Sequence, residues 1–254
     1  MSRLTTSKNP ALSKELFYKE SIKREQTAAE VMTINGTVNK TILMFVLLMI
    51  GAFYTWRIAM PIETGAAAVT KWMLIGGIGG FITALVTIFK KDWAHVSAPV
   101  YAVFEGLFLG AISAFFEAQF PGIVMQAVAL TFGTMFILLA AYKSGFIKVT
   151  KKFRTGVIIA TGAVAVTYLL SFILGMFNVQ VPIFQPTALG IIISLVIVVI
   201  AALNLVLDFD LIYQGAKQKA PKQMEWYAAF GLMVTLIWLY IEILRLLALL
   251  ASRD

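Results

Sequence analysis

The chain has 254 residues, a net charge of +8 and no cysteine. Hydrophobic residues make up 60% of it and charged residues 13%, against about 25% charged in an ordinary soluble domain. The lack of cysteine excludes disulfides, thiolate metal sites and a cysteine nucleophile. In so apolar a chain, excess positive charge is best explained by Lys and Arg in the cytoplasmic loops of a membrane protein, so we do not infer nucleic-acid binding.

Residues 1–39 are the first of two predicted regions, a polar tail on the cytoplasmic side of the membrane. A long charged segment precedes the first apolar stretch, and no small-residue cleavage site follows that stretch, which argues against a signal peptide. Within the tail, residues 13–31 mix apolar side chains with Lys and Glu. This pattern fits either a helix lying on the inner leaflet or a solvated chain.

Residues 40–254 are predicted to form the second region, a transmembrane domain. A bilayer core about 30 Å thick is crossed by roughly 20 apolar residues in a helix. Backbone groups in lipid must bond within their own segment, which makes each such stretch a helix. The sequence therefore predicts an all-α, polytopic membrane protein with seven transmembrane helices. The seven stretches are 41–60, 72–89, 97–116, 123–142, 156–177, 187–207 and 226–250.

Basic residues indicate the orientation of these helices. With a cytoplasmic N-terminus, most Lys and Arg fall on the cytoplasmic side, in the tail and in the loops at 90–95, 143–155 and 208–225. Positive charge favours that side of a membrane. We therefore expect a multi-pass protein, embedded in the lipid bilayer, whose C-terminus lies outside.

Small residues in the second stretch predict a close helix contact. Gly76 and Gly80 form a GxxxG pattern, and small residues at this spacing let two helix backbones approach each other.

Charges inside the predicted helices are the strongest candidates for function, because an ionised side chain at the bilayer centre costs about 2.5–3.5 kcal/mol. Glu105 lies eight residues into the third stretch, roughly 12 Å deep. Asp208 follows directly after the sixth stretch, at its cytoplasmic mouth, and Asn204 lies one turn deeper on the same face. We expect these three side chains to converge. Asp210 points elsewhere, about 200° around the helix from Asp208.

The last stretch carries an acid and a base close together. Glu242 lies roughly 24 Å from the inner edge of that stretch, and Arg245 follows at i, i+3, a spacing that lets the two side chains pair. The pair is either a neutralised structural contact or part of a functional site.

Known catalytic patterns are missing from the chain. It has no HExxH, no GxSxG and no GxGD, and its single histidine, His95, falls at the inner edge of the third stretch, where an interfacial role is expected. We therefore do not expect an enzyme.

Three short motifs resemble one family of membrane proteins. Glu-Gly-Leu-Phe-Leu-Gly at 105–110 is similar to the family's third helix, Leu-Asp-Phe-Asp-Leu-Ile at 207–212 to the end of its sixth, and Leu-Tyr-Ile-Glu-Ile-Leu at 239–244 to its last. Together with the seven-helix plan, they resemble the Bax inhibitor-1-like (transmembrane BAX inhibitor motif) family, in a bacterial branch. The resemblance implies a location in the bacterial inner membrane.

The resemblance also implies a fold and an activity. The fold is a seven-helix bundle with the last helix at its centre, and the activity is a pH-sensitive calcium leak controlled by a carboxylate pair between the sixth and seventh helices. Asp208 matches the sixth-helix acid, and Glu242 matches the seventh-helix acid by its motif. The two acids are expected at different depths in the membrane, because the residues of the last helix at the depth of Asp208 would be Thr235 or Leu236. Glu105 is the alternative partner of Asp208.

Two hypotheses of function follow. In the first, the chain is a pH-sensitive leak for Ca²⁺ or another cation, with H⁺ as the controlling ligand and no organic cofactor. Two poorly solvated carboxyls share a proton, and once ionised they attract Ca²⁺, which prefers oxygen ligands. Asp208 and Glu105 are the expected Ca²⁺ ligands. The full list of candidates for the cation and proton site is Asp208, Glu105, Asn204, Asp210 and Glu242.

In the second hypothesis the chain is a regulator without transport. It would bind a membrane protease or another stress-response factor, as some members of the resembled family do. Its expected contact surface is the charged tail together with the basic loop at 143–154.

Overall fold

The computed structural model describes residues 30–59, 62–177 and 185–253, without the side chains of 62–68. These residues form helices and no strand. Seven of the helices are long and apolar enough to cross a membrane, as predicted. They are α2 (Ile34–Ala59), α3 (Ile62–Phe89), α4 (Ala94–Gln119), α5 (Ile123–Lys143), α6 (Lys151–Met176), α7 (Ala188–Lys217) and α8 (Met224–Ala251). Nearly all of the interfacial helix suggested at 13–31 lies outside the described residues.

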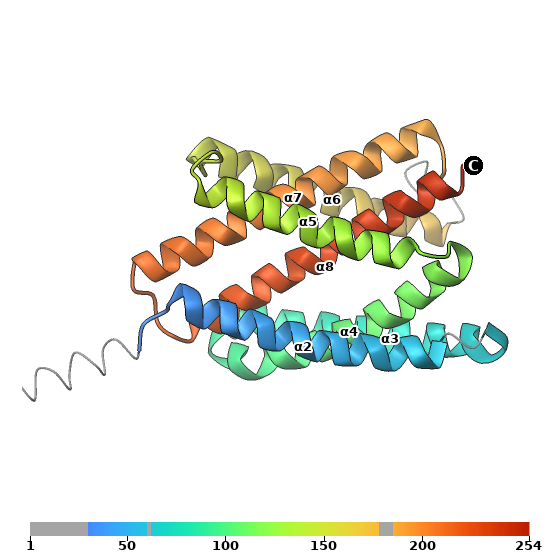
Figure 1. The fold of residues 1–254 in the computed structure, drawn as a ribbon, viewed down its shortest axis with the longest axis horizontal. Helices are drawn as coiled ribbons and strands as arrows, with labels where there is room; N and C mark the ends of the chain where they lie inside the picture. Colours follow the sequence, from blue (N-terminus) through green and yellow to red (C-terminus); the bar gives the residue numbers. More distant parts are fainter. Residues whose placement is uncertain (1–29, 60–61, 178–184, 254) are drawn as a thin grey trace, which may run out of the picture.

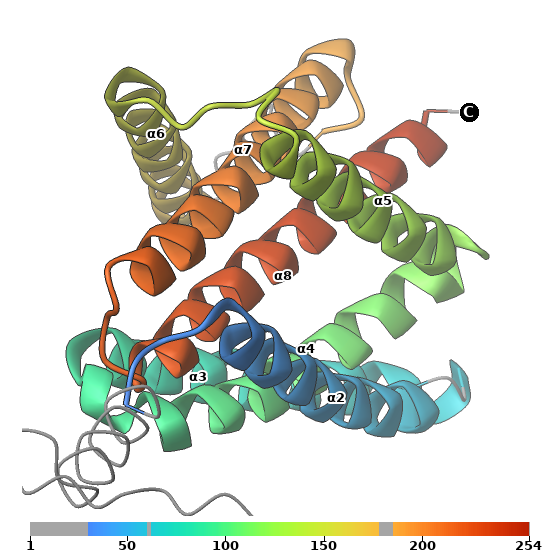
Figure 2. The ribbon, with the colours of Figure 1, turned by 60° about the vertical axis from the view of Figure 1, so that its left-hand side comes forward.

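The last helix occupies the centre of the bundle, which confirms the expectation from the family. Figure 2 shows α8 between α7 on one side and α2 and α4 on the other, with α5 across its far half. It packs against all four of these helices, while α3 packs on α4 and α6 on α7. Figure 1 likewise shows α8 running through the middle of the bundle, between α5 above it and α2 below it.

Several helices extend beyond the apolar stretches that predicted them. The helix α7 ends at Lys217, ten residues past the predicted end at 207, and its 30 residues are about 45 Å long. It is therefore longer than a bilayer core of about 30 Å. The prediction that Asp208 lies at the mouth of this helix is wrong, because Asp208 is nine residues, about 14 Å, before its end.

Glycines bring α4 close to both of its neighbours in the first half of the chain. A Cβ atom added to Gly106 would lie 2.2 Å from the backbone oxygen of Leu48 in α2. A Cβ atom added to Gly76 would lie 2.5 Å from the backbone nitrogen of Phe108 in α4. The close contact predicted from Gly76 and Gly80 is thus formed, and its partner is α4.

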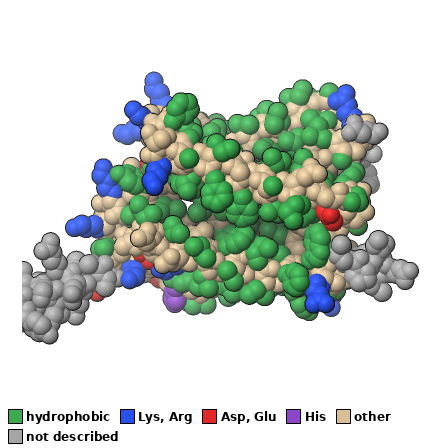
Figure 3. Space-filling model, in the orientation of Figure 1, with side chains coloured by type: hydrophobic (Ala, Val, Ile, Leu, Met, Phe, Trp, Pro, Cys, Tyr) green, Lys and Arg blue, Asp and Glu red, His purple; other side chains and the backbone are tan. Residues whose placement is uncertain are grey.

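A belt of large apolar side chains covers the outside of the bundle, and Figure 3 shows it between the two ends. An exposed apolar surface of this extent fits contact with lipid. Lys and Arg gather at the left of Figure 3, where α2 and α8 begin. We call this the Glu225 end, after a residue at the start of α8, and the opposite one the Arg57 end, after a residue at the end of α2.

Candidate functional site: the buried acids

The acids within the helices differ in what their carboxyl oxygens contact. Three pair with a cation, one accepts two backbone N–H groups, and two have neither kind of partner. The three ion pairs are Asp210–Arg154, Glu225–Lys40 and Glu242–Arg245. The other acids of the seven long helices whose side chains the structure describes are Glu117, Glu105 and Asp208.

Asp210 ties three helices together near the Glu225 end. Its Oδ2 lies 2.6 Å from Nη2 of Arg154 in α6, and its Oδ1 accepts a hydrogen bond of 3.1 Å from the Tyr142 hydroxyl in α5. Gln214, one turn further along α7, donates to the same oxygen at 3.3 Å. Asp210 was a candidate for the cation site, and the structure places it in this network, turned away from Asp208.

Glu242 is likewise occupied by its neighbours. Its Oε2 lies 2.6 Å from Nη2 of Arg245, the partner expected from the i, i+3 spacing. Its Oε1 accepts hydrogen bonds from the Tyr168 hydroxyl of α6 and from the Trp238 indole. It lies seven residues, about 10 Å, beyond Thr235 along α8. The structure therefore does not bring Glu242 to Asp208.

Glu225 forms a contact that the sequence did not suggest. Its Oε1 accepts hydrogen bonds of 2.9 Å from both the backbone N–H and the hydroxyl of Thr33, and its Oε2 contacts Lys40. The adjoining backbone is hydrogen-bonded as well, because the Met32 N–H donates to the backbone carbonyl oxygen of Ala220 at 2.7 Å. The segment before α2 is thereby fixed to the α7–α8 loop. Partners 192 residues apart leave no local signal, and no pattern in the sequence identified them.

Glu117 closes the turn between α4 and α5. Its carboxylate accepts hydrogen bonds from the backbone N–H groups of Gly122, at 2.7 Å, and Val124, at 3.1 Å. A carboxylate at a helix N-terminus is stabilised by such donors and by the helix dipole. Its role is local and structural.

Asp208 faces α8 across the centre of the bundle. Its Oδ1 is 4.0 Å from the position that a Cβ atom would take at Gly231, and Thr235, one turn further along α8, is the polar side chain beside it. Its Oδ2 is buried without a hydrogen-bond partner. No cation pairs with it among the residues that the structure describes. Thr235 is one of the two residues that the depth argument placed opposite Asp208.

Glu105 faces the other way, toward α3. A Cβ atom added to Gly80 would lie 2.7 Å from Glu105 Oε1, and Tyr101, one turn earlier in α4, is the polar side chain beside it. Gly80 thus leaves the space that the carboxyl fills. Within the described part of the chain, no cation pairs with Glu105.

The predicted convergence of Glu105, Asn204 and Asp208 is not formed. Glu105 lies at the α3–α4 contact and Asp208 at the α7–α8 contact, because the two acids sit on different helices that face different neighbours. Asn204 is turned toward α6, where its amide donates to the Thr161 hydroxyl at 2.8 Å. Glu105 and Asp208 therefore do not share one Ca²⁺ site. Among the described residues, no three His, Cys, Asp or Glu side chains are grouped as metal ligands.

The comparison with known families agrees with this architecture. The family model described as Bax inhibitor 1 like matches residues 9–252. The chain belongs to the Bax inhibitor 1-like family. No curated protein matches it with significance. In this member of the Bax inhibitor 1-like family, Glu242, the acid of the last-helix motif, forms an ion pair with Arg245.

Proposed function

We propose that this protein is a pH-sensitive leak for Ca²⁺ or another cation, and that the protonation of Asp208 controls it. The observation that carries the proposal is the place of Asp208, a carboxyl between α7 and the central helix α8 with a buried, unpartnered oxygen and no paired cation in the described chain. An ionised carboxylate in such a place is unfavourable unless water or a cation reaches it.

The protonated state would close the α7–α8 contact. The Asp208 hydroxyl would donate to the Thr235 oxygen, and Thr235 would donate to the backbone oxygen of Gly231, 3.2 Å from Thr235 Oγ1. Each hydroxyl proton then has an acceptor, and no charge remains at the contact. We expect little flux in this state.

Loss of the proton would open the contact. A carboxylate only accepts hydrogen bonds, and Thr235 has a single hydroxyl proton, which cannot serve both Asp208 and Gly231. The ionised Asp208 would then draw in water or Ca²⁺, a hard cation that binds carboxylate and carbonyl oxygens. Flux through the protein is therefore expected to rise with pH.

The orientation that we propose places the N-terminus in the cytoplasm and the C-terminus outside, in a bacterial inner membrane. It is supported by the gathering of Lys and Arg at the Glu225 end, since basic residues favour the cytoplasmic side. In this orientation Asp208 is closer to the cytoplasmic side than Glu242 is.

The experiment measures Ca²⁺ flux into proteoliposomes that contain the wild type or Asp208→Asn. Asparagine keeps the size of the side chain but cannot ionise, so we expect the leak to be lost. Asp92→Asn, an exposed acid at the Glu225 end, is the control and should leak like the wild type. Loss of flux in Glu105→Gln but not in Asp208→Asn would place the site at the α3–α4 contact instead.

A second proposal is that the protein also restrains a membrane protease or another stress-response protein. The loop between α5 and α6 supports it, because Phe146 is 88% exposed there and is followed by the exposed Lys148 and Lys151. Deletion of residues 1–29 leaves the Glu225 contact in place. A regulator that uses the tail should lose its partner in this variant, while the calcium leak should persist.

A further inference from the structure

A second feature of the bundle lies away from Asp208, toward the Arg57 end. It is an apolar cavity of about 590 Å³ between α2, α4, α5 and α8. Met49 and Phe53 of α2 form one wall, Val128 of α5 the other, and Leu236 of α8 the floor. Figure 3 shows apolar side chains lining a hollow between α5 above and α2 below.

The cavity opens sideways, to the surroundings of the bundle. The helices α2 and α5 are not a packed pair, although each packs on α8. They meet at the edge-to-face contact of Phe45 and Phe132, whose ring centroids are 5.4 Å apart. Beyond this contact, toward the Arg57 end, the two walls remain separate and the cavity is open between them.

Polar groups in the cavity walls already have partners inside the protein. The hydroxyls of Ser113 and Tyr240 are hydrogen-bonded to each other at 2.7 Å, and Thr131 donates to its own helix at 2.7 Å. Glu117 accepts its two backbone N–H groups. Ordered water needs two to four polar partners, and these walls offer few. Because the opening lies within helices that are long enough to span a membrane, we expect lipid hydrocarbon beside it.

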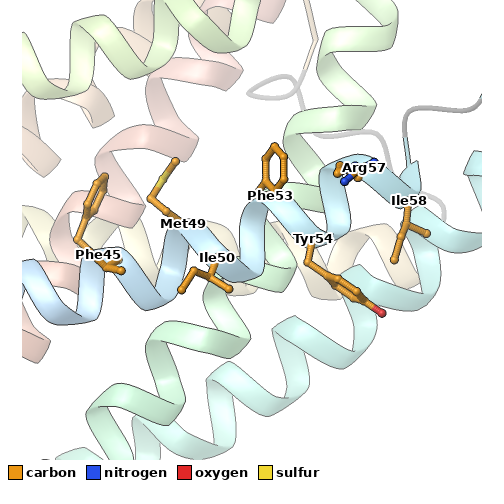
Figure 4. A pocket seen from close by; sticks show the side chains of 8 residues that line it. Phe45, Met49, Ile50, Phe53, Tyr54, Arg57 and Ile58 are labelled. Atoms are coloured by element: carbon orange, nitrogen blue, oxygen red, sulfur yellow. The ribbon is translucent and has the colours of Figure 1, made fainter.

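A cation lies at one end of a shallow groove on the outer surface of α2, which is lined by residues of that helix alone and adjoins the cavity. Figure 4 shows Phe45, Met49 and Phe53 following one another along α2, with Arg57 one turn beyond Phe53. Phe45, Met49 and Phe53 line both the cavity and this groove. The Arg57 guanidinium is exposed and lies 5.9 Å from the centre of the Phe53 ring. Among the described residues, no carboxylate forms an ion pair with Arg57.

We propose that the groove and cavity bind one phospholipid, with an acyl chain between α2 and α5 and the phosphate on Arg57. The acyl chain would fill apolar space in which few polar groups could bind water. The Arg57 guanidinium would pair with the phosphate through two parallel N–H donors, a geometry that suits arginine. The lipid would come from the leaflet at the Arg57 end. It would fix the spacing of α2 and α5, the two helices that flank the open side of α8. This site is separate from Asp208, and the proposal does not depend on the leak.

The test uses the full chain in nanodiscs that contain a phospholipid with a photoreactive group near the end of one acyl chain. After irradiation, the labelled residues are located by mass spectrometry. We expect labels on the cavity floor, at Leu236 and Met233, in addition to the lipid-facing side chains. Labels confined to outward-facing residues such as Ile137, which is 71% exposed, would overturn the proposal.

Two variants with matched controls sharpen the result. Val128→Trp fills the cavity and should abolish the floor labels, while Leu130→Trp, on the exposed side of the same helix, should keep them. Arg57→Gln should lower floor labelling by about fivefold at limiting probe, the effect of losing one cation that attracts anionic lipid groups. Lys71→Gln, a cation of the neighbouring α3 outside the groove, should not. Floor labels that remain in Val128→Trp would refute the acyl-chain site. Floor labelling that is unchanged in Arg57→Gln would refute the phosphate contact.

Discussion

Replacing Gly106 by alanine tests the close contact of α2 and α4. The added Cβ atom would lie 2.2 Å from the backbone oxygen of Leu48 and 2.9 Å from its carbonyl carbon. Ordinary contacts begin at about 3.4 Å, so the two helices would have to separate by roughly 1 Å. The obstacle is backbone and cannot rotate away. Overpacking of this kind costs about 1–3 kcal/mol, and we expect Gly106→Ala to lower the free energy of unfolding by that amount.

Gly133→Ala is the matched control, because a Cβ atom at Gly133 in α5 meets nothing within 4 Å. Alanine in a helix is otherwise better than glycine by about 0.5–1 kcal/mol. The control should therefore equal or exceed the wild type in stability. The assay is unfolding of the purified protein by increasing sodium dodecyl sulfate, followed by tryptophan fluorescence. If both variants unfold at the same point as the wild type, α2 and α4 do not approach as closely as described.

Two ion pairs give further predictions for the same assay. Lys40→Met leaves Glu225, which is 1% exposed, without its cation, and should lower the free energy of unfolding by about 3–5 kcal/mol. Arg154→Met should cost less, about 1–3 kcal/mol, because the Arg154 side chain is 50% exposed and Asp210 keeps its other donors. Lys148→Met, an exposed lysine of the α5–α6 loop, is the control. Losses no larger than that of the control would show that these pairs contribute little.

Much of the fold could be predicted from the sequence, because a bilayer imposes a simple rule. Each predicted stretch corresponds to a helix in the described part of the chain, and the glycines of the second one lie in a close helix contact. Hydropathy did not predict the helix ends. It falls sharply at Asp208, but the backbone hydrogen bonds of α7 continue to Lys217, where side chains at the edge of the bundle can be polar.

The candidate site was predicted only in part. Depth along the helices indicated that Asp208 lies opposite Thr235 or Leu236, and Thr235 is its contact. Depth alone could not tell which way Glu105 faces, because that depends on which helix packs beside α4. The contact of Glu225 with Thr33 joins segments 192 residues apart in the sequence, and no local pattern encodes it.

The most direct test of the account is the pH dependence of Ca²⁺ flux in proteoliposomes, measured on both sides of neutrality for the wild type and Asp208→Asn. The account predicts that wild-type flux rises with pH and that flux through Asp208→Asn stays low at both values. Wild-type flux and pH dependence in Asp208→Asn would contradict it, because an asparagine has no proton to lose at the α7–α8 contact.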